Sequence, residues 1–491
     1  MSRRYIEFLS FTYLRGPSLW TYRPVVEALV DIGDLEECPS DTVPGLPERL
    51  TALLPGLVEH RCSYGERGGF LRRVEEGTWP AHMLEHVTVE LQNLAGMTGG
   101  FGRARSTSTR GVYKVMVRAW HEEVTRTALH LGRDLLMAAI DPDTHGPFDV
   151  AAAVAALREL ADDLLLGPST QNIFDSATAK DRRVPAIRLN EGNLVQLGYG
   201  ARARRIWTAE TDATSAIGAD IARDKDLTKR LLADCGLPVP QGVRVDSPEA
   251  AWTAAQTIGL PVVLKPLDGN HGRGVSVDLS TSADVKAAYG VAEREGTGVI
   301  CERFVRGVEH RLLVVGGQML AAARGEEAWV TGDGRTCVTD LIDAQLNSDP
   351  RRGLNEDYPL NMIRIEHDPA VALELERQGL SGESIPAEGR RVLIQRNGNV
   401  AFDCTDEVHP DTAAIVVRAA RCVGLDIAGI ALVAEDISRP LGPQGGAIVE
   451  VNAGPGLIMH LRPAAGLPRL VGRAIVDYLF PDGADGRIPV V

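Results

Sequence analysis

The chain has 491 residues, of which 44% are hydrophobic and 24% charged, which is typical of a globular protein with two to four domains of roughly 100–200 residues each. Its formal net charge of −14 provides no basic field for a phosphate backbone, which argues against nucleic-acid and anionic-membrane partners. Seven cysteines without a CxxC pair, the absence of a signal-like N-terminus and the absence of an apolar run of roughly 20 residues predict a cytoplasmic protein with reduced thiols and no membrane span.

The first third of the chain is expected to form an α+β unit, because both helical and alternating spacings of apolar residues occur in it. The expected elements, in chain order, are a strand (4–14), helices (24–33, 46–57 and 80–96), a Gly-rich loop (96–111), a strand (112–120) and a helix (122–140). We expect this N-terminal α+β domain to cover residues 1–163. The segment that follows mixes Gly, Pro, Ser and charged residues, which is typical of a domain boundary.

Beyond residue 164, short buried strands alternate with helices, which is the pattern of an α/β domain. The expected strands are 260–267, 298–305, 310–317, 320–325, 391–396, 427–435 and 447–452, and the expected helices are 225–236, 247–259, 282–294 and 412–424. We therefore expect a second, α/β domain over residues 164–491.

The helix at 80–96 contains the sequence HMLEH, in which His82 and His86 lie one turn apart and share a face. Both imidazoles could bind one zinc ion, and Glu85 could then activate a bound water molecule. The third ligand would be Glu90, one further turn along, or Glu66. The alternative is that these polar residues form the solvated side of a helix whose buried side carries leucines and valines.

A Gly-rich hairpin, KPLDGNHGRGVSVDL (265–279), is the clearest chemical signature in the chain. Three glycines within six residues, Gly269, Gly272 and Gly274, allow a backbone to approach a polyphosphate closely, and Lys265 and Arg273 add positive charge. The sequence is neither a Walker A loop nor a dinucleotide fingerprint. Taken alone, the hairpin is equally compatible with a tight turn that requires positive φ.

The segments around this hairpin, DKDLTKRLLADCGLPVP, CERFVRGVEHRLLVV and EVNAGPG, resemble in their order the ATP-grasp superfamily, in which two α+β lobes close on ATP and magnesium. The resemblance implies an ATP-grasp fold over residues 164–491, with a central lobe at about 221–310. It assigns nucleotide contacts to Lys229, Lys265, the loop Gly269–Gly274 with His271, Gly272 and Arg273, Glu302 and Phe304 at the adenine hinge, and Glu309 at the ribose. Glu450 and Asn452, two residues apart on one strand, match its magnesium pair, and Arg311 is expected to stabilise charge during catalysis.

Longer blocks, including LGYGARARRIWTAETDATSAIGADIARDKDLTKRLLADCGLPVP and IVEVNAGPGLIMHLRPAAGLPRLV, are similar to cyanophycin synthetases, and so is the N-terminal domain. The resemblance implies an ATP-dependent ligase that forms C–N bonds on a poly-aspartate acceptor through an acyl-phosphate, and it suggests a homo-oligomer. The N-terminal domain of that family can carry a metallopeptidase-like site that trims the polymer. The Arg-rich loop at 96–111, with Arg103, Arg105 and Arg110, is then either a flexible connector or the mouth of that site.

Three departures from the family pattern affect the expected activity. The chain stops where the family enters a Mur-ligase-like P-loop, so arginine attachment by this polypeptide is not expected. The segment RNGNVAFDCTDEVHP (396–410) lacks the Ser-Thr-Gly-Gly loop that helps to hold the acceptor, and Ala431 stands where the family usually has a magnesium-binding aspartate. Impaired turnover with retained ATP binding is therefore expected. The alternatives are a zinc peptidase with the ATP-grasp part as a scaffold, or a non-catalytic nucleotide-binding subunit.

Overall fold

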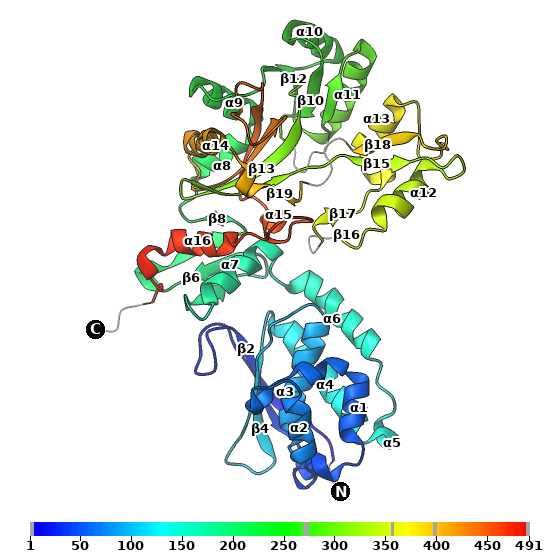
Figure 1. Ribbon diagram of the computed structural model, residues 1–491. Helices are drawn as coiled ribbons and strands as arrows, with labels where there is room; N and C mark the ends of the chain where they lie inside the picture. The colour runs from blue at the N-terminus through cyan, green and yellow to red at the C-terminus, as the bar shows by residue number, and fades with distance from the viewer. Residues whose placement is uncertain (1–3, 269–273, 355–357, 396–399, 488–491) are drawn as a thin grey trace. The chain divides into compact units, whose positions relative to one another are not determined.

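The computed structural model describes residues 4–268, 274–354, 358–395 and 400–487 (Figure 1). The chain divides into two compact units. The first comprises residues 1–167, 177–203 and 485–491, and the second comprises residues 168–176 and 204–484. Helix α7 (Pro168–Thr178) lies at the division between them. Among the described residues, no helix is both long enough and apolar enough to span a membrane.

The first unit is built on a four-stranded antiparallel sheet in the order β1-β2-β4-β3, and helices α3 and α4 pack against it. Its strands are β1 (Glu7–Leu14), β2 (Val25–Asp31), β3 (Gly102–Ser106), β4 (Val112–Arg118), β5 (Ala186–Arg188) and β6 (Leu194–Leu197). Its helices are α1 (Leu46–Leu53), α2 (Gly69–Glu76), α3 (Pro80–Leu94), α4 (Glu122–Ile140), α5 (Pro142–His145) and α6 (Val150–Leu164), with short turns η1 (Gly33–Glu37), η2 (Ser40–Thr42), η3 (Pro55–Glu59), η4 (Cys62–Tyr64) and η5 (Gly200–Arg202).

The expected helix over residues 24–33 is wrong, because the segment forms strand β2. Val26, Ala28 and Val30 are fully buried, and the residues between them are only half-buried. This period of two fits a pleated strand better than a helical turn, and β-branched valines favour it further. The helix over 122–140 is confirmed with the same bounds.

The central lobe of the second unit is a four-stranded sheet, in the order β11-β10-β12-β9, with helices α10 and α11 packed against it (Figure 1). The strands are β9 (Gly242–Val245), β10 (Val262–Pro266), β11 (Ser276–Leu279) and β12 (Val299–Arg303). The helices are α10 (Pro248–Ile258) and α11 (Ser282–Glu295). Strand β10 ends at the start of the Gly-rich hairpin, whose residues 269–273 lie outside the described part of the chain.

The other sheet of the second unit has five strands in the order β19-β14-β13-β20-β21, and the adjacent strands are antiparallel. Helices α8, α9 and α14 share a buried core with β20 and β21. The strands are β13 (Val308–Val315), β14 (Gln318–Arg324), β19 (Phe402–Asp403), β20 (Ile427–Ala434) and β21 (Ala447–Ala453). The remaining elements are β7 (Arg204–Trp207), β8 (Glu210–Thr211), α8 (Ala216–Arg223), α9 (Lys225–Asp234), η8 (Thr405–Glu407), α14 (Pro410–Val423), α15 (Ile458–Leu461), α16 (Val471–Leu479) and η9 (Pro481–Gly483).

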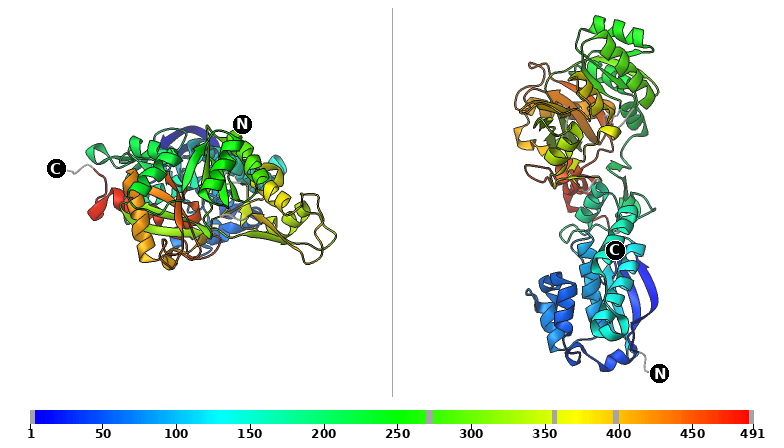
Figure 2. Two further views of the ribbon diagram at one scale, coloured as in Figure 1. Left: turned by 90° about the horizontal axis from the view of Figure 1, so that it is seen from above. Right: turned by 90° about the vertical axis from the view of Figure 1, so that its right-hand side faces the viewer.

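A small lobe is inserted in this sheet between β14 and β19, and it has its own buried core (Figure 2). Of its elements, only the last strand is expected from the sequence. Its elements are β15 (Ala328–Thr331), α12 (Val338–Ile342), η6 (Asp343–Asn347), β16 (Arg352–Gly353), β17 (Leu360–Asn361), η7 (Ile365–His367), α13 (Pro369–Arg377) and β18 (Arg391–Gln395).

Candidate functional site

Three neighbouring strands of the five-stranded sheet place Arg311, Ala431 and Glu450 directly opposite one another. Residues opposite one another in adjacent strands project from the same face. Arg311 Nη1 donates to Glu450 Oε2 at 3.1 Å, and Arg311 Nη2 lies 2.8 Å from Glu309 Oε1. Asn452, two residues beyond Glu450, donates to the same carboxylate at 3.2 Å. The expected ribose, catalytic and magnesium residues therefore form one connected network, with Ala431 at its centre.

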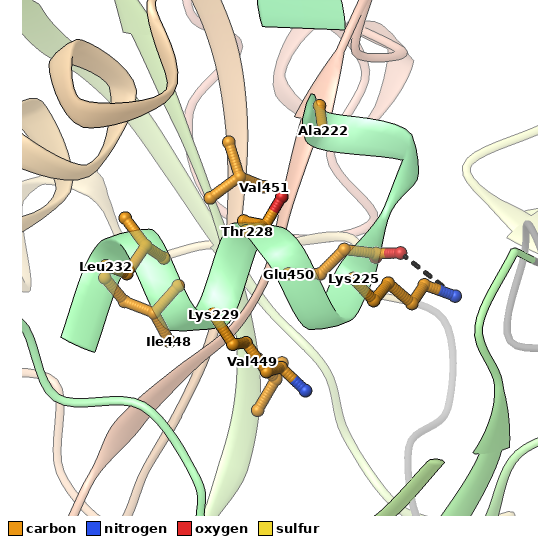
Figure 3. Close-up of a pocket in the computed structure, with 9 residues that line it drawn as sticks. All are labelled: Ala222, Lys225, Thr228, Lys229, Leu232, Ile448, Val449, Glu450 and Val451. Atoms are coloured by element: carbon orange, nitrogen blue, oxygen red, sulfur yellow. Dashed lines mark ion pairs between the residues drawn. The ribbon is translucent and has the colours of Figure 1, made fainter. Parts of the chain in front are cut away.

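The structure adds Lys225, for which the sequence pattern predicts no role. Lys225 is the first residue of α9. The helix begins there because the Asp224 side chain accepts hydrogen bonds from the backbone N–H groups of Asp226 and Leu227 in the first turn. Its Nζ lies 3.6 Å from Glu450 Oε1. Figure 3 shows this ion pair beside a small pocket between α9 and β21. Lys225 thus brings a positive charge to the expected magnesium pair.

Lys229, one turn further along α9, instead joins a buried group of opposite charges. It forms an ion pair with Glu302, and Lys265 Nζ lies 3.1 Å from the other oxygen of the same carboxylate. Lys265 also donates to the Val449 carbonyl at 3.3 Å. All three ionisable side chains are buried. The two lysines therefore compensate the charge of Glu302 and tie the central lobe to α9 and β21.

The charges of the network shift the pKa values of its members. Burial raises the pKa of Glu450, but Arg311, Lys225 and Lys265 lower it more strongly, so its pKa lies below the usual value for glutamate. Burial lowers the pKa of Lys265 and of Lys229. A carboxylate that stays ionised beside several cations is suited to holding a divalent ion near phosphate oxygens. The donor set of Glu450 and Asn452 is the oxygen-rich type that magnesium prefers.

The remaining nucleotide residues expected from the sequence are only partly described. Gly269, His271, Gly272 and Arg273 lie outside the described residues. Gly274 has a φ of 72°, and a Cβ there would lie 2.9 Å from the Cβ of Glu295, so this end of the hairpin requires glycine. Phe304 donates its backbone N–H to the Pro261 carbonyl at 3.0 Å. It also lines a cleft of about 730 Å³ where the central lobe joins the five-stranded sheet.

Asp403 and Asp406, two carboxylates in the segment that lacks the acceptor loop, both form ion pairs with Arg469. Arg469 Nη2 lies 2.6 Å from Asp403 and 2.9 Å from Asp406. Burial raises the pKa of Asp403, but hydrogen bonds from Arg469 and Thr405 outweigh burial and lower the pKa to about 2. The charges of Asp403 and Asp406 are therefore both compensated by Arg469. The segment 396–399, next to the missing acceptor loop, lies outside the described residues.

In the first unit, His82 and His86 lie on α3 and meet a thiol that the sequence analysis did not select. The ligand atoms of Cys62, His82 and His86 all lie within 4.8 Å of one another. Cys62 Sγ is 3.3 Å from His82 Nε2, and the other ring nitrogen of His82 is hydrogen-bonded to Thr78 Oγ1 at 2.9 Å. A thiol and two imidazoles are the donor set that zinc prefers. These residues therefore fit a zinc ion.

The surrounding carboxylates differ in their placement. Glu85 Oε1 lies 3.5 Å from His86 Nε2, its other oxygen is buried and has no hydrogen-bond partner among the described residues, and burial raises its pKa to about 8. Glu90 is hydrogen-bonded to His60 at 2.9 Å, and Glu66 forms an exposed ion pair with Arg72. The interpretation of this face as solvated is wrong, because Glu85 and Glu90 are each only 6% exposed.

The Arg-rich loop at 96–111 is in part an edge strand, since residues 102–106 form β3 and pair with β4. Arg103 and Arg105 on this strand act electrostatically on Glu85 and partly offset the effect of its burial. Arg110 forms an ion pair with Glu37. Arg103 and Arg105 thus act on the Glu85 carboxylate, whereas Arg110 has a structural partner in Glu37.

Comparison with known proteins follows the same division of the chain. Residues 27–141 match the family model described as the cyanophycin synthase-like N-terminal domain, and residues 220–297 match that of the ATP-grasp domain. The cyanophycin synthetases of Geminocystis herdmanii and Synechocystis sp. are each 40% identical over 99% of this chain and 56% of their own length. The glutathione biosynthesis bifunctional protein of Mannheimia succiniciproducens is 30% identical over 64% of this chain and 42% of its own length.

Among solved structures, a bifunctional glutathione synthetase from Pasteurella multocida is 28% identical, with a TM-score of 0.46, and the match covers 73% of this chain and 50% of that one. The chain spans about half the length of the curated cyanophycin synthetases it matches. The two family models match successive parts of this chain, and these relatives align with 99% of it. The chain therefore carries a cyanophycin synthase-like N-terminal domain ahead of an ATP-grasp domain, and it is similar to cyanophycin synthetases over almost all of its length.

Proposed function

We propose that this protein is an ATP-dependent carboxylate–amine ligase whose acceptor is a poly-aspartate-type peptide. The observation that supports this most strongly is the network in which Arg311 bridges Glu309 and Glu450 while Lys225 contacts Glu450 from α9. Cations and hard oxygen ligands thus converge on one face, as phosphoryl transfer requires. The name of the relatives, cyanophycin synthetase, favours a polymeric acceptor. We further propose that the protein acts as a cytoplasmic homo-oligomer.

The reaction would proceed in two balanced steps. An oxygen of the acceptor carboxylate attacks the γ-phosphorus of ATP, so that an acyl-phosphate forms and ADP leaves. The amine nitrogen of the incoming substrate then attacks the acyl carbon, the C–N bond forms, phosphate leaves with the former carboxylate oxygen, and one amine proton passes to solvent. Lys225, Lys265 and Arg311 would stabilise the negative charge that develops on the transferred group. Glu450 and Asn452 would hold Mg²⁺, which supplies further charge neutralisation when bound.

We propose that turnover on such an acceptor is weak. Ala431 stands between Arg311 and Glu450, at the position where a second carboxylate would add a third oxygen ligand to the magnesium site of Glu450 and Asn452. Removing one electrostatic group from such a site typically costs about 10²–10³ in rate. The missing acceptor loop after residue 399 adds a loss of positioning. ATP binding depends on other residues and would be retained.

Phosphate release with ATP, Mg²⁺, aspartate and a short poly-aspartate acceptor tests this proposal. We expect slow release that requires both the acceptor and the amine, and that is abolished in Lys225→Met. ATP binding without acceptor-dependent phosphate release would instead identify a non-catalytic nucleotide-binding subunit. No ATP binding, together with unchanged folding, would refute the proposal.

The cluster in the first unit supports a second candidate function, a zinc-dependent peptidase that acts on an aspartate-backbone polymer. Its support is the grouping of Cys62, His82 and His86 beside Glu85, which has a buried oxygen with no partner in the part of the chain that the structure describes. Cys62, His82 and His86 would hold the ion, which would lower the pKa of a water molecule bound to it. Glu85 would accept the proton of that water molecule, and Arg103 and Arg105 would face an acidic polymer. Time-dependent shortening of poly-aspartate, lost on chelation and in Glu85→Gln, is the expected result.

A further inference from the structure

His86 of the cluster with Cys62 and His82 is also the first of three largely buried polar residues that are hydrogen-bonded in series. The other two are His60 and Glu90. His60 follows the short turn η3, and its Nε2 is 2.9 Å from Glu90 Oε2. Its other ring nitrogen, Nδ1, is 2.9 Å from Nδ1 of His86. The side chains of His60, His86 and Glu90 are 10%, 12% and 8% exposed, so solvent does not readily replace these partners.

The two hydrogen bonds of His60 together determine which nitrogen of His86 carries a proton. The Glu90 carboxylate only accepts hydrogen bonds, and Asn93 also donates to it at 3.2 Å, so the proton in the His60–Glu90 bond lies on Nε2 of His60. A neutral His60 then has a lone pair on Nδ1. With His60 in this neutral form, the short contact between the two Nδ1 atoms needs one proton, which His86 supplies. Nε2 of His86 is left with a lone pair.

The packing around these residues holds the same orientation. The Phe70 ring stacks on His86 with centroids 4.1 Å apart and an interplanar angle of 24°. A Cβ at Gly56, in η3, would collide with the Glu90 carboxylate, so η3 approaches α3 closely and delivers His60 to the two α3 residues. Thr78 orients His82 in a similar manner, because its hydroxyl is hydrogen-bonded to Nδ1 of His82 and Nε2 then faces Cys62. His82 thus has Nε2 toward Cys62, whereas His86, whose Nδ1 faces His60, has Nε2 3.5 Å from Glu85 Oε1.

We propose that His60 and Glu90 are positioning residues that fix His86 in the tautomer whose Nε2 binds a metal ion. This inference rests on the proposed metal site and adds to it the residues that prepare one of its ligands. Histidine ligands of metal ions generally donate their second ring nitrogen to a carboxylate or to another acceptor, and loss of that partner typically lowers metal affinity about 10–100-fold. Here the acceptor is a second histidine, which is itself oriented by a carboxylate. Glu90, expected from the sequence to be a direct ligand, would then act through His60.

The test compares the full chain with His60→Phe, which keeps an aromatic ring of similar size, and with Glu90→Gln, whose amide oxygen can still accept the hydrogen bond of His60. Titration with Zn²⁺ or Co²⁺ alone gives the affinity and the stoichiometry. We expect His60→Phe to bind metal about 10–100-fold more weakly with the sulfur-to-cobalt charge-transfer band retained, and Glu90→Gln to lose less. His86→Phe should abolish the site, and thermal denaturation of each variant checks folding.

Nitrogen-15 NMR of the histidine rings in the metal-free protein provides an independent measurement. The wild-type spectrum should show His86 protonated on Nδ1, and His60→Phe should convert part of it to the Nε2-protonated form. If the wild type binds no metal but shows this tautomer, the proposed metal site is refuted, and so is the role of His60 and Glu90 in metal binding. Equal metal affinity of wild type and a folded His60→Phe, or a wild-type His86 protonated on Nε2, overturns the inference while leaving the metal site itself intact.

Discussion

Replacement of Ala431 by aspartate would place a carboxylate between Arg311 and Glu450, on the same face of the five-stranded sheet. Ala431 is 1% exposed, so the new charge would be buried and would need a partner. Arg311 already contacts Glu309 and Glu450 at 2.8 and 3.1 Å and lies directly across from position 431. The new carboxylate therefore meets a cation at once, and it offers Mg²⁺ a third oxygen ligand alongside Glu450 and Asn452.

The expected gain follows from the loss attributed to the missing group. One preorganised electrostatic group is worth about 10²–10³ in rate, or about 2.7–4 kcal/mol. The full rate gain is not expected, because the strand and Arg311 are packed around the smaller alanine side chain. The acceptor loop is also still missing, so the acceptor is positioned less well. We expect Ala431→Asp to raise kcat about 10–100-fold at saturating Mg²⁺, which corresponds to about 1.4–2.7 kcal/mol at 1.36 kcal/mol per tenfold. The affinity for ATP and the KM for the acceptor should change little.

The assay is phosphate release over a series of Mg²⁺ concentrations, with Ala431→Asn as the matched control. Asparagine has nearly the same size as aspartate but adds no charge, so it should give no gain in kcat and no lower Mg²⁺ requirement. Calorimetry of ATP binding and the melting temperature separate catalysis from folding. A folded Ala431→Asp protein with unchanged kcat at all Mg²⁺ concentrations, or an equal gain in Ala431→Asn, would refute the reasoning.

The remaining predictions concern three other parts of the chain. Lys225→Met should weaken ATP binding by about 1.5–3 kcal/mol, the range of a hydrogen bond to a charged group, with little change in stability; Lys229→Met should instead lower the melting temperature, because Glu302 loses one of its two buried counter-ions. Equal effects of both variants on ATP affinity, measured by calorimetry, would contradict this division of roles. The Asp403 carboxyl, with its pKa lowered to about 2, should contribute about 2 kcal/mol of stability that is fully present above the ordinary aspartate pKa and is lost as the pH falls through 2. Urea unfolding of Asp403→Asn should therefore show a deficit at pH 7 that shrinks between pH 4 and pH 2, and a deficit independent of pH would count against the Arg469 partnership. Elemental analysis of protein purified without chelator should find about one zinc ion per chain, absent from His82→Ala; a wild-type protein without metal would return the cluster to a purely structural role.

The elements predicted best from the sequence are those whose apolar spacing extends over several turns. Helix α4 was predicted with its observed bounds, and the long helix around HMLEH was also confirmed. The sequence of β2 predicts a helix wrongly, because its seven residues, with valines at 25, 26 and 30, satisfy either period when tertiary contacts are unknown. The inserted lobe was largely missed, since its strands are short and its small core forms only from residues far apart in sequence.

The candidate sites show the same limit at the level of single side chains. Arg311, Glu450 and Asn452 are expected from the resemblance to the ATP-grasp superfamily, and the two-residue spacing of Glu450 and Asn452 on one strand agrees with it. Lys225 and Lys229 are one helical turn apart, and only the packing of α9 against β21 shows that Lys225 reaches Glu450. Cys62 and His60 precede HMLEH by about twenty residues, and no periodicity connects them with α3. One sequence signal could indicate them. A histidine and a cysteine stand within one short segment that precedes a helix with two candidate metal ligands.

The most direct measurement of the central claim follows an oxygen atom. A poly-aspartate acceptor whose terminal carboxylate is labelled with oxygen-18 is incubated with ATP, Mg²⁺ and aspartate, and the released phosphate is analysed by mass spectrometry. The ligase reaction through an acyl-phosphate transfers one labelled oxygen from the carboxylate to each phosphate produced, even when turnover is slow. Release of phosphate without label, at the rate seen in the absence of acceptor, would contradict the proposed ligase.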